Sequence, residues 1–524
     1  MKQKFKFVLL LLIFCGIGLW FVGIDEPFVG AYGANLNFFT LAAKNFSRFG
    51  YLKLHFLPTY YSGGNLGKIP DFYLHHPVFY YTLVSLPFKV FGFHNWVAAV
   101  TPLFFSLLSL YWLAKIGSFL WNKKTGLWVA VFGSFTPIMT VFGRQTIFEP
   151  AVLALLLGVY YYFLRFIRFK KTRDLMCFSI LSFLAVLIDW GGAYFIFPFL
   201  LLYWLFPKGK EKKLAVLLYF TSILVGLSLF ILIVFLVRGN FGDLLGAISS
   251  RQANPELFNL PHPWFKLILV SLLRIVIYLT PLSLLALFIF LKDLVKAVKL
   301  KKINLQMVTF LFFLIFGLLN LIFLPAASFG HIYFLLYLVP FFALILGKYF
   351  ADLSVKKSLF SVVFVVIIYL FSSLVTYAKW QQIEKQVWRY DAALKINTQL
   401  APYEAIAVKG FPGDIFEQYF FHPTKPIEDY SGLLNWLGQA KSGERKIVFS
   451  CWDTCSEEDN QFIENIPYKT TKFAKAWLIE NTEIDKPATL LEKQQIEKPV
   501  KTEESSLLIR VYRLLRDKLQ VGQL

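Results

Sequence analysis

The sequence is poor in cysteine, in charged residues and in the motifs of nucleotide or zinc chemistry. Four cysteines among 524 residues are too few for a disulfide framework. Charged residues make up 16% of the chain, against about 25% in ordinary soluble domains, which excludes a water-soluble globule. No Walker A, Gly-rich dinucleotide, His-Glu-x-x-His or Gly-x-Ser-x-Gly motif occurs. An ATPase, an enzyme with a nucleotide-sugar donor, a zinc protease and a serine hydrolase are therefore disfavoured.

Apolar residues dominate instead, at 57% of the chain with 59 phenylalanines. A membrane-spanning helix needs about 20 apolar residues, and we expect about 11 such helices. The expected spans are roughly residues 7–24, 95–120, 127–142, 150–166, 175–189, 193–206, 214–237, 264–290, 303–324, 332–347 and 359–379. The apolar stretch 78–92 is short and contains Pro87, so it is predicted to lie at the membrane surface. The sequence thus predicts an all-α polytopic membrane domain.

The basic residues indicate the orientation of these spans. The net charge is +21, and one set of alternate loops holds 22 Lys and Arg in 52 residues, whereas the other set holds 8 in 113. Lys and Arg concentrate in cytoplasmic loops. The pattern predicts a multi-pass protein of the cell membrane with a cytoplasmic N-terminus. A signal peptide is the alternative interpretation of the basic start, but no small-residue cleavage site precedes Asp25.

The composition changes near Trp380. Residues 381–524 hold 21 of the 32 acids and 19 of the 53 bases, so they are nearly neutral. This change predicts a membrane domain over 1–380 and a soluble extracytoplasmic domain over 381–524. β-like runs at 405–408, 446–449 and 507–511 predict an α/β fold for the second domain. Cys451 and Cys455 face an oxidising side in this topology, where they form either a disulfide or a reduced pair.

Acids and histidines of the membrane domain gather on the predicted outer side. Four of its eleven acids lie in cytoplasmic loops, where surface ion pairs with Lys or Arg explain them. The other seven are Asp25, Glu26, Asp71, Glu149, Asp189, Asp243 and Glu256. The outer histidines are His55, His75, His76, His94, His262 and His331. A solvated outer face is the simplest explanation, but charges close to hydrocarbon are costly and usually functional.

Outer loops of unusual length or polarity carry these residues. The first, 25–94, is long enough to suggest a function. Within it, apolar residues at helical spacing predict an amphipathic helix over 34–49 that lies on the membrane, and Gly63-Gly64 predicts a turn. The second, 142–150, has Arg144 near one end and Glu149-Pro150 at the start of the next span.

Each of these site candidates also has a structural explanation. Glu149 is explained equally well as an acid favoured at a helix start. Asp189 can cap the turn 189–192. His331 can be an ordinary interfacial residue at the lip of its span. The pattern alone leaves these alternatives open.

Carboxylates, an arginine and imidazoles at one membrane face fit proton transfer, metal binding or phosphate recognition. Arg and imidazole groups can hold a lipid phosphate at headgroup level. A carboxylate can remove a proton from an acceptor hydroxyl. Together these groups suit the transfer of a sugar from a lipid phosphate, in which positive charge stabilises the leaving phosphate.

Five segments, in order, resemble the glycosyltransferases that use polyprenol-phosphate sugars and share the membrane fold called GT-C. This group includes protein O-mannosyltransferases and the aminoarabinose transferases of lipid A. The resemblance covers roughly residues 1–350, with a short first span, a long outer loop and an extracytoplasmic C-terminal domain. The segments are Ile24-Asp25-Glu26, His75-His76-Pro77-Val78, 143–150, Asp189-Trp190-Gly191, and His331-Ile332-Tyr333 with Leu338-Val339-Pro340.

The resemblance implies roles for these residues. Asp25 or Glu26 matches the family's catalytic base, and Glu149 matches the acid of the second outer loop. Arg144 and His331 match positions that line the donor-phosphate region. His75-His76-Pro77 stands where some relatives have Glu-Lys-Pro, so His76 is expected to replace the phosphate-binding Lys. The remaining site candidates are Asp71, Asp189 and Tyr333.

The implied partners are a polyprenyl-phosphate sugar donor, a hydroxyl acceptor on a glycan, lipid or protein, and membrane lipids, without nucleic acid. A divalent metal held by Asp25, Glu149 and His75 is the only cofactor that the residues suggest. A lipid-linked transporter or flippase, or a non-catalytic assembly protein, is the alternative function. The sequence does not distinguish the sugar or the acceptor.

Overall fold

The computed structural model divides the chain into two compact units. The first comprises the described residues of Met1–Glu26, Phe46–Pro58 and Phe72–Gln381, and the second those of Pro27–Asn45, Thr59–Asp71 and Gln382–Leu524. The structure describes residues 3–29, 33–62, 72–205, 210–239, 242, 244–246, 259–300, 304–353, 358–398, 400, 406–409, 415–426, 430–438, 446–451, 456–473 and 476–483. Asp71, Asp243, Glu256, Cys455, Gly63-Gly64 and the run 507–511 therefore lie outside the described residues.

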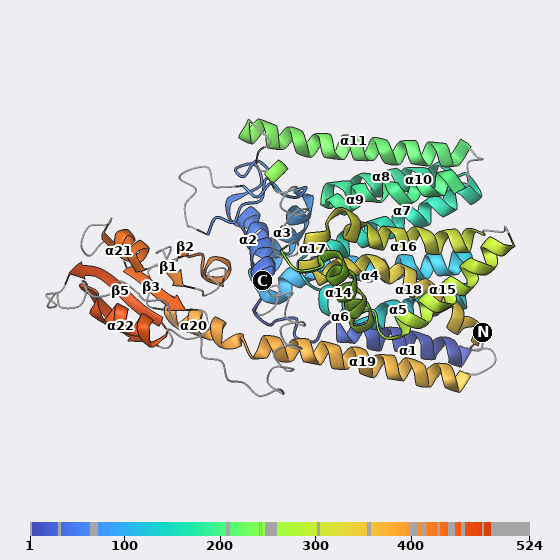
Figure 1. The fold of residues 1–524 in the computed structure, drawn as a ribbon. Helices are drawn as coiled ribbons and strands as arrows, with labels where there is room; N and C mark the ends of the chain where they lie inside the picture. The colour runs from blue at the N-terminus through green and yellow to red at the C-terminus, as the bar shows by residue number, and fades with distance from the viewer. Residues whose placement is uncertain are drawn as a thin grey trace. The chain divides into compact units, whose positions relative to one another are not determined.

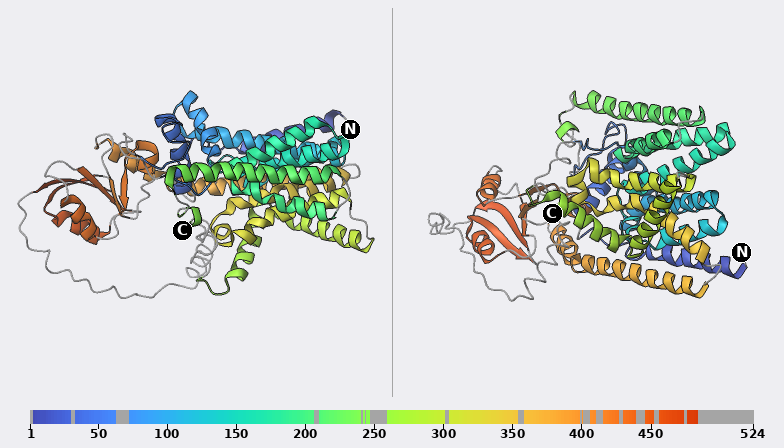
Figure 2. Two further views of the ribbon diagram at one scale, coloured as in Figure 1. Left: turned by 90° about the horizontal axis from the view of Figure 1, so that it is seen from above. Right: turned by 45° about the vertical axis from the view of Figure 1, so that its right-hand side comes forward.

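The first unit is a bundle of helices whose long members run side by side (Figures 1 and 2). Its helices are α1 (Gln3–Leu19), α3 (Phe79–Phe91), α4 (Asn95–Leu120), α5 (Lys123–Phe135), α6 (Pro137–Phe142), α7 (Glu149–Phe169), α8 (Thr172–Ile188), α9 (Trp190–Tyr194), α10 (Ile196–Leu205), α11 (Lys210–Arg238), α14 (Pro263–Tyr278), α15 (Leu282–Lys299), α16 (Leu305–Phe323), α17 (Pro325–Gly330), the 3₁₀ helix η1 (Ile332–Leu338), α18 (Val339–Leu353) and α19 (Ser358–Glu384).

The apolar stretches of the sequence overlap these helices, which form a multi-pass membrane protein. By length and composition, six helices among the described residues can each cross a membrane, or seven spans if one bent pair counts as a span. The count of about 11 spans stays a prediction. The surface helix expected over 78–92 coincides with α3, which includes Pro87.

One expected span is not a single helix. The stretch 264–290 forms α14 and α15, which are bent by 109° at the break between them. Thr280 lies in this break with φ 70°. Pro281 follows it, and a proline disfavours helical geometry in the residue before it and lacks the N–H that would continue the helix. The expected span 127–142 is likewise divided, at Thr136, into α5 and α6.

The helices differ in how much of their surface is covered. Most of α7 and of the segment η1–α18 is buried within the unit, whereas most of α11 and α19 is exposed. Large apolar side chains such as Leu217, Leu232 and Leu370 are more than half exposed on these outer helices. An apolar exposed surface of this kind is typical of contact with lipid.

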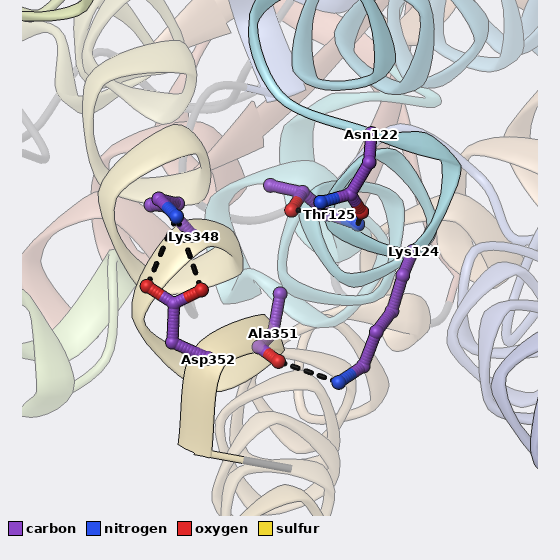
Figure 3. Close-up of polar contacts among 6 residues, drawn as sticks. All are labelled: Asn122, Lys124, Thr125, Lys348, Ala351 and Asp352. Carbon is purple, nitrogen blue, oxygen red and sulfur yellow. Dashed lines mark hydrogen bonds and ion pairs between the residues drawn. The ribbon is translucent and has the colours of Figure 1, made fainter. Parts of the chain in front are cut away.

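Small residues let α5 pack closely on its neighbours α4 and α18. A methyl group at Gly347 of α18 would lie 2.7 Å from the backbone nitrogen of Val129 on α5. Such close backbone approach is common between membrane helices. Polar contacts add to it (Figure 3): the Lys124 ammonium donates to the Ala351 carbonyl at 2.5 Å, and Lys348 pairs with Asp352 at 3.0 Å.

The second unit contains a five-stranded sheet of order β2-β1-β3-β5-β4. β1 pairs in parallel with β2 and β3, whereas β5 pairs antiparallel with β3 and β4. Ala407, Phe449 and Ile479 of the sheet share a core with residues of its helices. The elements are α2 (Gly33–Phe49), α20 (Val387–Asn397), β1 (Ile406–Lys409), the π-helix η2 (Phe416–Phe420), β2 (Thr424–Pro426), α21 (Tyr430–Gly438), β3 (Lys446–Cys451), α22 (Glu457–Asn465), β4 (Tyr468–Phe473) and β5 (Ala476–Glu483).

Part of the first outer loop belongs to this second unit, which corrects the assignment of the whole loop 25–94 to the membrane domain. Val29 shares a core with Ile396 and Phe416. The Lys44 ammonium of α2 is buried and donates to the backbone oxygen of Gln418 at 3.1 Å. The helix expected over 34–49 is present as α2, but part of it packs against protein, and its buried Lys44 has the polar partner that a buried cation needs.

Candidate functional site

The second outer loop, which joins α6 to α7, is held in place by α4. The Gly143 amide donates to the Met139 carbonyl at 3.0 Å and ends α6. The Ser106 hydroxyl donates to the Gly143 carbonyl at 2.6 Å, and that of Thr146 donates to the carbonyl of Ala98 at 3.2 Å. These bonds fix the loop at both ends, so the side chains between them have defined directions.

Arg144 of this loop lies near Glu26, at the end of the first span. Burial lowers the pKa of the Arg144 guanidinium, and the negative charge of Glu26 opposes that effect. Glu26 folds back against Gly23, where an added methyl group would lie 2.5 Å from a carboxylate oxygen. Gly23 has φ +68°, which favours glycine. The structure thus brings together Glu26, one of the two candidates for the catalytic base, and Arg144, which the resemblance assigns to the donor-phosphate region.

Asp25 is placed differently from its neighbour. Its side chain is exposed, and its backbone carbonyl accepts a hydrogen bond from the Asn95 amide at 3.0 Å. Its carboxylate makes no ion pair with the described residues. The structure therefore separates the two adjacent acids: Glu26 interacts with the half-buried Arg144, whereas Asp25 remains accessible.

His76 and Asp189 form a buried pair that joins the first and third outer loops. The Nδ1 atom of His76 lies 2.5 Å from a carboxylate oxygen of Asp189, and the two side chains are 11% and 9% exposed. The other carboxylate oxygen accepts from the Gly191 amide at 3.4 Å and caps α9. The expectation that Asp189 caps a turn is confirmed, but the residue also holds His76, whose ring stacks on Phe148 at 4.5 Å.

His75 contacts the third outer loop through its backbone carbonyl. Its carbonyl accepts from the Trp190 indole at 2.8 Å, and its ring contacts that of Tyr73 at 4.5 Å. The hydrogen bond from Trp190 adds a second link between the first and third outer loops. The two adjacent histidines thus make different contacts, and His76 pairs with the carboxylate of Asp189.

Glu149 begins α7 and is only 3% exposed. The burial of Tyr80, and secondly the negative charge of Glu149, raise the pKa of the Tyr80 hydroxyl well above its ordinary value. The hydroxyl of Tyr337 also interacts electrostatically with Glu149 and Asp189. Neither tyrosine hydroxyl has a hydrogen-bond partner among the described residues. Both stay protonated in this setting and are available as donors beside a buried carboxylate.

His331 lies in a crevice with a cation that sequence analysis missed. The crevice is lined by Ser271, Arg274 and Asn320 as well as His331. The Arg274 guanidinium donates to the Ser328 carbonyl at 3.0 Å. Lys379 of α19 is close enough to Arg274 for the two positive charges to repel each other.

Tyr333 connects this cluster to the second outer loop. Its ring stacks on His331 at 4.9 Å and contacts Phe142 at 6.1 Å. Arg274 and Lys379 were overlooked because they lie inside apolar stretches that were assigned to spans. The available signal was their charge itself, since a cation within a span is costly and usually functional.

The second outer loop thus contacts three groups of polar residues through successive side chains. Phe142 touches the ring of Tyr333, Arg144 interacts with Glu26, and Phe148 stacks on His76. No three His, Cys, Asp or Glu residues among those described lie close enough to hold a metal. The expected metal set of Asp25, Glu149 and His75 is therefore not assembled.

Comparison with solved structures defines the fold. The crystal structure of ArnT from Cupriavidus metallidurans bound to undecaprenyl phosphate matches with TM-score 0.61 at 12% identity, over 92% of this chain and 99% of that chain. The archaeal oligosaccharyltransferase AglB from Archaeoglobus fulgidus, in complex with an inhibitory peptide and a dolichol-phosphate, matches with TM-score 0.52 at 13% identity, over 93% of this chain and 75% of that chain. The chain has the GT-C membrane fold, which confirms the resemblance drawn from the sequence.

A family model gives a more particular similarity. Residues 75–237 match the family described as dolichyl-phosphate-mannose-protein mannosyltransferase. The matched segment includes the pair of His76 and Asp189 and, between them, Arg144 and Glu149. No protein of curated function matches the chain by sequence.

Proposed function

We propose that the protein is a membrane glycosyltransferase that moves a sugar from a polyprenyl phosphate to a hydroxyl group on the outer face of the membrane. The proposal rests on the contacts of the second outer loop within a GT-C fold: Arg144 interacts with Glu26, and Phe148 stacks on His76 of the His76–Asp189 pair. Phe142 contacts Tyr333, whose ring stacks on His331 beside Arg274. The ArnT structure with the same fold contains undecaprenyl phosphate. The predicted outside position of this site, with the N-terminus in the cytoplasm and about 11 spans, is part of the proposal.

The donor phosphate is proposed to bind at the cluster of Arg274, Lys379 and His331. Arg274 and Lys379 lie near enough for their positive charges to interact, and a phosphate bound beside them would reduce their repulsion. Arginine and lysine form short, charge-assisted hydrogen bonds with phosphate oxygens. These groups would also stabilise the charge that develops on the phosphate when the sugar leaves.

Asp25 is proposed as the general base, and Glu26 as the residue that positions Arg144. Glu26 interacts with the Arg144 charge, whereas the exposed carboxylate of Asp25 is open to an acceptor hydroxyl. The acceptor hydroxyl gives its proton to Asp25 while its oxygen forms a bond to C1 of the sugar. The bond from C1 to the phosphate oxygen breaks, and polyprenyl phosphate leaves from the opposite face. Attack opposite the leaving group inverts the configuration at C1.

Mass spectrometry of cell-envelope glycans from a deletion strain tests the function. We expect at least one glycan to lose a single sugar residue, and to regain it when the wild-type gene is returned. An unchanged glycan profile would contradict the proposal. Scrambling of undecaprenyl phosphate by the reconstituted protein, without any missing sugar, would instead favour a flippase. Broken helices such as the pair α14 and α15 also occur in transporters.

Replacing Arg274 and Lys379 together by glutamine is expected to weaken the binding of undecaprenyl phosphate about 100-fold. The estimate assumes the loss of two charge-assisted hydrogen bonds of about 1.5 kcal/mol each. Native mass spectrometry with undecaprenyl phosphate measures the affinity. Lys292→Gln, on an exposed part of α15, is the matched control and should bind normally. Equal affinities of all three proteins would place the phosphate elsewhere.

Chelation of divalent metals by EDTA is expected to leave sugar transfer unchanged. Arg274 and Lys379 supply fixed positive charge at the proposed phosphate site, so a metal is not needed to neutralise the leaving group. Transfer is measured with purified protein before and after chelation. A loss of transfer that Mg²⁺ or Mn²⁺ restores would show that the carboxylates of the site hold a metal during the reaction.

A further inference from the structure

A second cavity lies at the opposite end of the first unit, far along the helices from the outer loops. It has a volume of about 510 Å³, within the usual range of roughly 300–1,000 Å³ for ligand sites. It is formed where α4 and α7 end and where α11 and α16 begin, and this end of the bundle also carries the N-terminus (Figure 1). The loops at this end hold the excess of Lys and Arg that predicts the cytoplasmic face.

The walls of this cavity are apolar and its rim is cationic. Phe119, Phe163 and Val308 are among the apolar lining residues, and Arg168 and Lys212 are its charged ones. The Arg168 guanidinium lies over the Phe119 ring at 5.3 Å. A guanidinium that stacks by its face keeps the N–H groups of its edge free to bind an oxyanion in a bidentate manner.

Neighbouring carboxylates compensate the charge of this rim only in part, since Glu211 interacts electrostatically with Lys212. Glu211 pairs with Lys170 at 2.7 Å, and Asp174 pairs with Arg165 at 2.8 Å. No carboxylate of the described residues pairs with Arg168. The Arg168 side of the rim is therefore complementary to an anion.

The start of α16 adds hydrogen-bond donors to the same cavity. The Asn304 side chain accepts from the Met307 amide at 2.9 Å and caps the helix. The first amides of a helix lack an acceptor within the helix, and Leu305 and Gln306, which begin α16, line the cavity. The positive end of the helix dipole supports binding of an anion at this position.

We infer that this cavity binds the headgroup of an anionic phospholipid from the cytoplasmic leaflet. The phosphate would lie between Arg168, Lys212 and the first turn of α16, and the first methylene groups of the acyl chains would contact Phe119 and Phe163. Basic pockets between membrane helices on the cytoplasmic side are suited to such headgroups. A bound lipid would join the ends of four helices through one ligand. This inference does not depend on the proposed sugar transfer.

Native mass spectrometry of the purified full-length protein tests this inference with phosphatidylglycerol, and with phosphatidylcholine of the same acyl chains. We expect phosphatidylglycerol to bind more tightly and to raise the thermal unfolding midpoint more than phosphatidylcholine does. The double variant Arg168→Gln/Lys212→Gln is expected to bind phosphatidylglycerol about 30-fold more weakly. Arg173→Gln removes an exposed base at the same end of the bundle but outside the cavity, and should bind as the wild type does.

Several results would overturn the inference. Equal binding of the two phospholipids would do so, and so would undiminished binding of phosphatidylglycerol by the double variant. Binding of undecaprenyl phosphate in place of phosphatidylglycerol, lost in the double variant, would assign the cavity to a different lipid. If the double variant does not fold, Lys212→Gln alone is measured, and it should show a smaller loss in the same direction.

Discussion

Replacement of Asp25 by asparagine is expected to slow sugar transfer by about 10²–10⁴-fold, the usual contribution of a general base. Asparagine has nearly the same shape but cannot accept the proton of the acceptor hydroxyl. The thermal unfolding midpoint should remain that of the wild type, because the Asp25 side chain is exposed and its contact with Asn95 is made by the backbone. The measurement is the initial rate of transfer at saturating donor.

Two comparison variants sharpen this test. Asp293→Asn neutralises another exposed carboxylate of the first unit and should transfer normally. Glu26→Gln should chiefly raise the donor concentration needed for half-maximal rate, because it removes the charge that faces Arg144. A normal rate for Asp25→Asn combined with loss of activity in Glu149→Gln would move the base to the buried acid of α7.

Replacement of Asp189 by alanine is expected to destabilise the protein by about 3 kcal/mol and to reduce transfer strongly. Loss of one partner from a buried polar pair leaves the other without its hydrogen bond, which typically costs about 1–3 kcal/mol and more for a charged group. His76 is in this position, since both side chains of the pair are about nine-tenths buried. Alanine also removes the cap of α9. Thermal or denaturant unfolding in detergent measures the stability.

A double-mutant cycle separates the pair from its surroundings. If the contact between His76 and Asp189 carries the effect, the double variant His76→Phe/Asp189→Ala should be more stable than Asp189→Ala alone. Phenylalanine retains the aromatic contact with Phe148 that the imidazole makes. Additive losses in the cycle would mean that the two residues act independently and that the pair does not fix the third outer loop.

Sequence patterns located most helices but not their breaks. Apolar runs predicted α4, α7, α11 and α16 well because lipid-facing and buried surfaces are both apolar, so length alone marks a span. The same property hid the bend between α14 and α15, where the polypeptide turns at Thr280 and Pro281. It also hid Arg274 and Lys379, whose charges were averaged into apolar surroundings.

The sequence by itself determined that the chain is a polytopic membrane protein and that acids and histidines flank its spans, because apolar length and charge spacing are local properties. Only the tertiary structure decided which polar residues meet. His76 and Asp189 are 113 residues apart, and Glu26 reaches Arg144 through the packing of helices that are distant along the chain. Asp25 and Glu26 are adjacent in sequence, yet the turn at Gly23 leaves Asp25 exposed to water and brings Glu26 near the half-buried Arg144. Composition does not contain this difference in environment.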